Sequence, residues 1–121
     1  MLCQTLAGNN CEMLIITDFQ ATDEKLAERE AIILSARVHP GETPASFVME
    51  GVIDFLLSND AKAKQLRSSF VFKIVPMLNA DGVINGNSRC NLIGLDMNRQ
   101  WRFAEGAAPE IEALREQVVK T

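Results

Sequence analysis

The chain has 121 residues, a length that fits one domain, and is 47% hydrophobic and 23% charged, as globular proteins are. Its 16 acidic residues outnumber 12 Lys and Arg for a net charge of -4, which argues against nucleic-acid binding. With one histidine, His39, and three scattered cysteines, the sequence excludes a self-contained zinc finger and a disulfide framework.

The cysteines and the N-terminal segment together indicate an intracellular protein. An odd number of scattered cysteines favours reduced thiols in a cytosolic type of compartment. The first cation is Lys25 and no sustained apolar run precedes it, so the start of the chain does not resemble a signal peptide. No stretch approaches the ~18 apolar residues that a membrane span requires. We therefore expect a cytoplasmic protein that binds neither membrane nor nucleic acid.

The first forty residues predict two strands separated by a polar connection. Residues 11–17 and 31–38 are apolar runs of strand length, and the second is apolar on both faces, as central strands are. Residues 18–30 between them are polar and mostly charged, which is typical of a surface connection. Pro40 and Gly41 should end the second strand abruptly, because both disrupt strand pairing.

A helix is predicted directly after this turn. Thr43 is expected to be its N-cap and Pro44 its first helical residue. Between positions 45 and 58 the polar residues recur at every fourth position, at Ser46, Glu50, Asp54 and Ser58. Only one narrow ridge of this helix should therefore face water, and most of its circumference should be covered by other parts of the protein.

The second half of the chain completes an α/β pattern. Residues 60–68 predict a short helix and residues 70–75 a third strand, an order typical of a right-handed crossover between neighbouring parallel strands. Residues 76–101 mix turn-forming and apolar residues, which indicates an ordered functional loop. A last helix should begin at Pro109 and carry one apolar face, formed by Ile111, Leu114 and Val118.

His39 and Glu42 form the first candidate for chemistry. They follow a predicted strand, and ligands bind at the carboxyl ends of strands in open α/β sheets. An imidazole and a carboxylate three residues apart on a tight turn can reach the same metal ion. The alternative is a surface histidine beside a helix N-terminus, where the helix dipole favours a carboxylate such as Glu42.

Two arginines of the long loop form the second candidate. Arg89 and Arg99 are surrounded by Gly, Asn and apolar residues rather than by other charges. The donor fork of an arginine suits a carboxylate, so either residue could hold an anionic substrate group. The alternative is a structural role, in which an arginine binds loop carbonyls or pairs with Asp81 or Asp96.

Four motifs together resemble a known family. They are HPGE at 39–42, NADGV at 79–83, GNSRC at 86–90 and GLDMNRQW at 94–101. The combination resembles the zinc metallocarboxypeptidases, the superfamily of the digestive carboxypeptidases A and B. The run from NADGV onward is similar to the cytosolic branch, which removes glutamates from tubulin and other proteins. The resemblance implies a three-layer α/β/α fold around a mixed, largely parallel sheet, present here in incomplete form.

The resemblance also implies roles for individual residues. His39 and Glu42 match the first two ligands of a Zn²⁺ ion. Arg89 matches the arginine that polarises the scissile carbonyl and stabilises the developing oxyanion. Asn98 and Arg99 match the pair that binds the free C-terminal carboxylate of the substrate. Acidic C-terminal tails of proteins, as in tubulin, are the partners that this branch implies.

The sequence departs from the family pattern in two ways. Small differences occur at Ala80, Ser88 and Gln100, where proline, an aromatic residue and asparagine are common, and none removes a functional group. The larger departure is that the family needs a second zinc histidine and a glutamate general base, neither of which has a match here. Residues 1–121 are therefore expected to form the amino-terminal portion of one catalytic domain, inactive in isolation and prone to self-association through uncovered apolar surfaces.

Two other functions stay open at this point. The same fold could serve as a non-catalytic module in which Arg89, Asn98 and Arg99 hold acidic C-terminal tails without cleaving them. A deacylase similar to aspartoacylase is the other possibility, although Trp101 after the Asn-Arg pair favours the carboxypeptidases.

Overall fold

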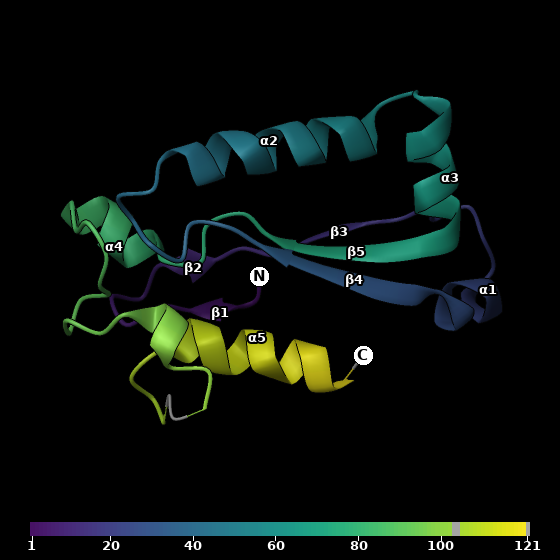
Figure 1. Ribbon diagram of the computed structural model, residues 1–121. Helices are drawn as coiled ribbons and strands as arrows, with labels where there is room; N and C mark the ends of the chain where they lie inside the picture. The colour runs from purple at the N-terminus through teal and green to yellow at the C-terminus, as the bar shows by residue number, and fades with distance from the viewer. Residues whose placement is uncertain (103–104, 121) are drawn as a thin grey trace.

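The chain folds into three layers in the computed structural model, which describes residues 1–102 and 105–120. A mixed sheet lies between helix α2 (Pro44–Leu57) on one face and helix α5 (Pro109–Lys120) on the other (Figure 1). This arrangement confirms the α/β class and the layered fold in its incomplete form.

The main sheet has the strand order β3 (Leu14–Ile16), β5 (Phe70–Val75) and β4 (Glu30–Ser35). Strand β4 runs parallel to β5, whereas β3 is antiparallel to β5, so the sheet is mixed. The predicted parallel neighbours are confirmed, and β5 has the predicted bounds. The prediction that 31–38 forms a central strand is wrong within the described sheet, because β5 pairs on both sides and β4 on one.

The predicted strand at 11–17 is divided between two sheets. Strand β2 (Asn10–Cys11) pairs with β1 (Cys3–Gln4) in a small antiparallel ribbon, whereas β3 pairs with β5. The chain changes pairing partner between Cys11 and Leu14, so a continuous strand cannot form there. The predicted surface connection at 18–30 also contains a short helix, α1 (Asp23–Glu28).

The helices begin close to their predicted positions. Asp60 caps α3 (Ala61–Ser69) by accepting a hydrogen bond from the backbone N–H of Lys62 at 2.8 Å. Thr43 occupies the N-cap of α2, but its hydroxyl makes no capping bond. Its backbone is already helical (φ -55°, ψ -34°), whereas a side-chain cap usually requires an extended backbone, so the predicted capping is wrong in this respect.

Two clusters of buried side chains hold the layers together. On the α2 side, Phe72 and Ile74 of β5 pack with Met49 and Leu56. On the α5 side, the cluster unites the end of β5, the helix and the long loop through Val75, Leu78, Met97, Ile111 and Leu114. Leu78 and Met97 are fully buried, which confirms that residues 76–101 form an ordered loop. This loop contains helix α4 (Ala80–Asn85) and the 3-10 turn η1 (Met97–Arg99).

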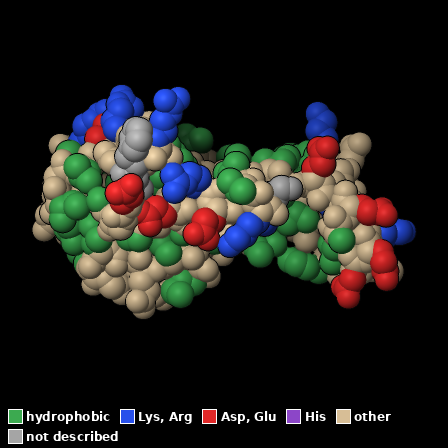
Figure 2. All heavy atoms as spheres, turned by 90° about the horizontal axis from the view of Figure 1, so that it is seen from below, with side chains coloured by type: hydrophobic (Ala, Val, Ile, Leu, Met, Phe, Trp, Pro, Cys, Tyr) green, Lys and Arg blue, Asp and Glu red, His purple; other side chains and the backbone are tan. Residues whose placement is uncertain are grey.

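The described residues do not cover all the apolar surface. On α2, Phe47 and Val48 are 71% and 68% exposed, although the sequence pattern predicts a helix that is mostly covered. On the opposite face, Ile33 of β4 and Val118 of α5 line a hollow. Figure 2 shows exposed hydrophobic side chains along the narrow middle of the molecule on that face. None of the described helices has both the length and the apolar character needed to cross a membrane.

Candidate metal and substrate site

The turn between β4 and α2 brings His39 and Glu42 together. Nδ1 of His39 lies 3.3 Å from Oε1 of Glu42. The imidazole is buried, with 8% of the residue exposed, whereas the carboxylate of Glu42 is exposed. The site therefore places a buried ring nitrogen of His39 beside a solvent-exposed carboxylate of Glu42.

This pair fits a zinc ion. Two ligands with zinc bonds of about 2.1 Å at a tetrahedral angle lie ~3.4 Å apart, close to the 3.3 Å between these two atoms. Nε2 of His39 lies 2.9 Å from Oδ1 of Asp96, so a neutral imidazole that donates there presents its lone pair at Nδ1. Two acceptor atoms then face each other, an arrangement that a cation between them stabilises.

Asp96 joins three of the predicted site residues. Besides its contact with His39, its Oδ2 accepts hydrogen bonds from Nε and Nη2 of Arg89, both at 2.8 Å. Its Oδ1 accepts from the backbone N–H of Asn98 at 3.0 Å, which caps the turn η1. Asp96 is thus a candidate site residue, although the sequence pattern indicated it only as a partner for an arginine. One signal could have pointed to Asp96 from the sequence. A metal-binding histidine commonly donates a hydrogen bond from its second ring nitrogen to a carboxylate, and Asp96 lies in the same motif as Asn98 and Arg99.

The electrostatics of Asp96 follow from these contacts. The hydrogen bond with His39 lowers the pKa of the Asp96 carboxyl, and burial opposes it. The Asn98 N–H and the positive charge of Arg89 lower this pKa further, so that it lies below its ordinary value. Asp96 is therefore ionised at neutral pH and acts as an acceptor for the His39 ring.

Arg89 has the structural partner that the sequence analysis left open. It pairs with Asp96, although half of its side chain is exposed (50%). The same carboxylate contacts His39, so this ion pair also holds the guanidinium near the candidate metal ligands. The ion pair with Asp96 shows the structural role, and the oxyanion role that the resemblance implies for Arg89 stays a prediction.

Asn98 and Arg99 lie on the η1 turn next to Asp96. Oδ1 of Asn98 accepts a hydrogen bond from Nε1 of Trp101 at 2.8 Å, which orients the amide. Arg99 is exposed, and within the described part of the chain its guanidinium makes one long hydrogen bond, 3.5 Å to the carbonyl of Asn98. The fork of Arg99 is therefore open to an anion, but no contact in the described residues links it directly to His39, Glu42 or Arg89.

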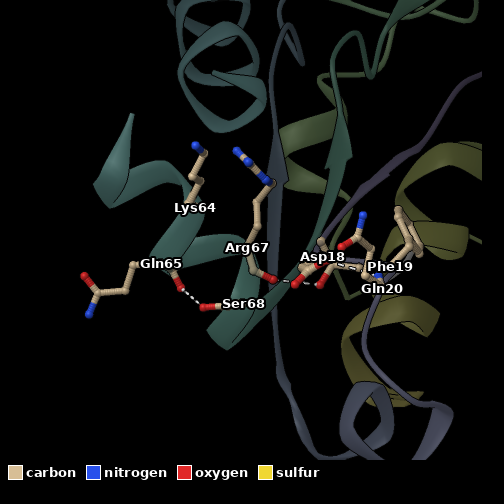
Figure 3. Close-up of a pocket in the computed structure, with 8 residues that line it drawn as sticks. Asp18, Phe19, Gln20, Lys64, Gln65, Arg67 and Ser68 are labelled. Atoms are coloured by element: carbon tan, nitrogen blue, oxygen red, sulfur yellow. Dashed lines mark hydrogen bonds between the residues drawn. The ribbon is translucent and has the colours of Figure 1, made fainter. Parts of the chain in front are cut away.

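Two other observations delimit the site. Residues 1–102 and 105–120 contain no group of three or more His, Cys, Asp or Glu side chains placed to hold a metal ion. A pocket of about 780 Å³ lined by Asp18, Lys64 and Arg67 lies beside α3 (Figure 3). That pocket is near the start of β5, whereas His39 follows the end of the parallel strand β4, so it lies at the opposite end of the sheet.

Comparison with known proteins agrees with the geometry. Residues 2–117 match the family model of zinc carboxypeptidases. The chain is 55% identical to cytosolic carboxypeptidase 1 of Danio rerio over 106 residues, which are 84% of this chain and 9% of that protein. It is 52% identical to cytosolic carboxypeptidase 2 of Mus musculus over 101 residues, 84% of this chain and 12% of that protein. The chain thus spans about a tenth of the length of these relatives.

Solved structures show the same fold. A metallocarboxypeptidase from Burkholderia cenocepacia superposes with a TM-score of 0.88 at 30% identity, over 98% of this chain and 32% of that one. A metallocarboxypeptidase from Pseudomonas aeruginosa in complex with (2-guanidinoethylmercapto)succinic acid gives 0.83 at 26% identity, over 97% and 30%. With the family match over nearly its whole length, the chain belongs to the zinc carboxypeptidase family.

Proposed function

We propose that this chain supplies two zinc ligands and the substrate clamp, Asn98 and Arg99, of a carboxypeptidase. The enzyme removes C-terminal residues from protein tails. The observation that carries the proposal is the convergence of His39 Nδ1 and Glu42 Oε1 at 3.3 Å in a chain of this family. The complete reaction belongs to the whole protein, because this chain spans about a third of the solved relatives.

His39 and Glu42 would hold the zinc ion, and Asp96 would fix the orientation of the imidazole. Zinc, when bound, supplies a Lewis acid that polarises the scissile carbonyl and activates water. Arg89 donates hydrogen bonds toward the oxygen on which negative charge develops. Its pairing with Asp96 keeps its guanidinium in one place before the substrate arrives, so less reorganisation is needed during the reaction.

The exposed donors favour a substrate with a free C-terminal carboxylate. Asn98 and Arg99 bind the free C-terminal carboxylate, and the open guanidinium of Arg99 can engage it with two parallel hydrogen bonds. Acidic tails ending in glutamate, as in tubulin, are the proposed substrates. The relative from Pseudomonas aeruginosa was solved with a succinic acid derivative, which supports recognition of carboxylates by this fold. The relatives named cytosolic support a cytoplasmic site of action.

A peptide that ends in several glutamates tests this proposal. The whole protein with Zn²⁺ should shorten the peptide from its C-terminus, as seen by mass spectrometry, and should leave the C-terminally amidated peptide intact. His39→Ala should abolish the cleavage. Cleavage that persists in this variant, or that proceeds equally on the amidated peptide, contradicts the assignment.

A non-catalytic binding module is the second candidate. It is favoured by the exposed guanidinium of Arg99, which can bind a terminal carboxylate whether or not the peptide is cleaved. In that case the protein should bind the glutamate-ended peptide without shortening it, and amidation should still weaken the binding. Binding without cleavage in the whole protein supports the module, whereas cleavage decides for the enzyme.

A further inference from the structure

The backbone just before the candidate zinc ligands has an unusual conformation. Arg37 has φ of 57°, in the left-handed region that side chains other than glycine rarely adopt. It follows the end of β4 by two residues and precedes His39 by two. Such a conformation persists only where the surrounding structure determines it, and it is common at functional sites.

Backbone contacts on the β5 side hold this conformation. The carbonyl of Ala36 accepts a hydrogen bond from the N–H of Leu78 at 2.9 Å, and that of Arg37 from the N–H of Asn79 at 3.1 Å. The carbonyl of Val38 accepts from Nδ2 of Asn79 at 3.2 Å. Leu78 and Asn79 are fully buried, so three consecutive carbonyls before His39 are bound to a fixed part of the protein.

The side chain of Arg37 then reaches around the turn that carries both ligands. Its Nε donates to the carbonyl of Pro40 at 2.8 Å, and its Nη1 donates to Oγ of Ser46 in α2 at 2.7 Å. Pro40 lies between His39 and Glu42 in the sequence, and Ser46 lies beyond Glu42. Because the guanidinium is rigid and planar, one side chain fixes the turn relative to the helix. Both acceptors are neutral, so Arg37 restrains the position of the turn without neutralising a charge there.

A second set of contacts restrains the same turn. The N–H of Gly41 donates to the carbonyl of Ser88 at 2.8 Å. A Cβ on Gly82 would lie 2.4 Å from Cγ of Pro40, so α4 approaches the turn too closely for any side chain there. The turn is thus restrained by backbone and packing contacts as well as by the guanidinium of Arg37.

We infer that Arg37 is a positioning residue for the metal site, which sets the placement of His39 and Glu42 by tying their turn to α2. The inference rests on the proposed zinc site, but the immobility of the turn can be measured without zinc. His39 is the only histidine in the sequence, so its ring signals in an NMR spectrum are unambiguous.

The experiment compares Arg37→Ala, Arg37→Gly and Ser46→Ala with a matched control, Arg29→Ala. Nη1 of Arg29 donates to Oγ1 of Thr17 at 2.7 Å and to the carbonyl of Asp18 at 2.9 Å, the same kinds of acceptor far from the turn. Hydrogen exchange of the Gly41 and Glu42 amides reports the turn. The change in the ¹⁵N shift of the His39 ring with added Zn²⁺ reports the metal site.

Arg37→Ala and Arg37→Gly should speed hydrogen exchange of both amides. Each should also weaken the response of His39 to Zn²⁺ about tenfold, the loss of metal affinity typical for a residue that supports a metal ligand. Ser46→Ala should give a smaller change of the same kind. Arg37→Gly should lower the Tm less than Arg37→Ala does, because glycine adopts the left-handed backbone without strain. Arg29→Ala should lower the Tm and leave the turn unchanged.

Wild-type exchange and zinc response in Arg37→Gly would overturn the inference, because the backbone alone would then place the ligands. Equal acceleration in Arg29→Ala would also overturn it, since the effect would be one of overall stability. If His39 of the wild-type protein does not respond to Zn²⁺, its assignment as a zinc ligand in the proposed function fails, whereas the amide exchange still decides whether Arg37 holds the turn.

Discussion

Oδ1 of Asp96 lies 2.9 Å from Nε2 of His39, although 57 residues separate them in the sequence. The contact selects the tautomer of the only histidine and leaves Nδ1 facing Glu42. It also connects the turn after β4 with the η1 turn that carries Asn98 and Arg99. The metal half and the substrate half of the proposed site therefore share one carboxylate.

Replacing that carboxylate should weaken the metal site. We expect Asp96→Asn to reduce Zn²⁺ affinity about 10- to 100-fold, the usual effect of losing the carboxylate that supports a histidine ligand. A chelator competition assay measures this change. Asp54→Asn, an exposed residue of α2, is the matched control and should bind Zn²⁺ as the wild type does. Equal affinities in the two variants would contradict the role of Asp96.

The substrate clamp makes a separate prediction. Arg99→Ala should weaken binding of a glutamate-ended peptide about tenfold or more, because charge-assisted hydrogen bonds to the terminal carboxylate are lost. Fluorescence anisotropy with a labelled peptide measures the affinity. Lys62→Ala removes a positive charge from exposed α3 and should leave the affinity unchanged. Assignment of Arg99 fails if both variants bind the peptide equally well.

Asp81 should stabilise the protein in a pH-dependent way. Burial raises the pKa of its carboxyl, but hydrogen bonds from Thr5 (2.6 Å), Asn9 (2.9 Å) and the N–H of Ala7 (2.9 Å) outweigh burial and lower it below the ordinary value. A lowered pKa in the folded state contributes stability above the unfolded pKa and loses it as pH falls through the folded pKa.

We therefore expect Asp81→Asn to cost about 1–3 kcal/mol at pH 7, since an amide leaves a donor of the cluster unpaired. The cost should shrink at acid pH, where the wild-type carboxyl also becomes protonated. Urea unfolding at several pH values measures it, with Asp54→Asn as control. A cost that stays constant through the acid range would show that the charge of Asp81 is not responsible.

Glu110 should change the stability with pH in the direction opposite to Asp81, because its pKa is raised rather than lowered. It is 2% exposed, and within the described residues its buried Oε2 has no hydrogen-bond partner. Burial, and then the nearby charge of Asp81, raise its pKa against the effect of a backbone hydrogen bond. The folded state therefore keeps its proton to higher pH than the unfolded state, and stability falls as pH rises between the two pKa values. Glu110→Gln should gain stability relative to wild type from pH 4 to pH 7, and a constant difference in urea unfolding would contradict this.

The exposed apolar residues of α2 predict self-association of this chain. Phe47 and Val48 form an apolar surface on the helix, and β4 pairs with one neighbour in the described sheet. We expect sedimentation velocity to show concentration-dependent oligomers, and Phe47→Lys with Val48→Lys to reduce them. Glu50→Lys on the same helix is the control and should not. Monomeric behaviour of the wild-type chain at all concentrations would exclude this surface as a contact.

The sequence predicted those helices and strands whose ends are marked by neighbouring residues. Asp60 and the apolar run at 70–75 gave α3 and β5 nearly to the residue, because capping and strand length are readable from neighbouring positions. The break after Cys11 was not readable, because it depends on which distant strand each half pairs with. The prediction that residues 31–38 form the central strand was wrong for the same reason. Both β4 and β5 are apolar runs, so the sequence does not show which of them pairs on both sides.

The site was predictable only in part. The resemblance of the motifs to those of the zinc carboxypeptidases predicts His39, Glu42, Arg89, Asn98 and Arg99 as site residues, and their roles stay predictions. The role of Asp96 depends on a contact across 57 residues, and the left-handed backbone of Arg37 depends on hydrogen bonds with residues that follow β5. Such long-range contacts leave no regular spacing in the sequence.

The ring nitrogens of His39 provide the most direct test of the central claim. With Zn²⁺ added to the ¹⁵N-labelled protein, the Nδ1 signal should shift strongly while Nε2 keeps the signature of a hydrogen bond to Asp96. Glu42→Gln should weaken this response, and Glu12→Gln, at an exposed glutamate of the N-terminal region, should not. Binding of Zn²⁺ through Nε2, or no change at Nδ1 with excess Zn²⁺, would contradict the assignment of His39 and Glu42 as a zinc-binding pair.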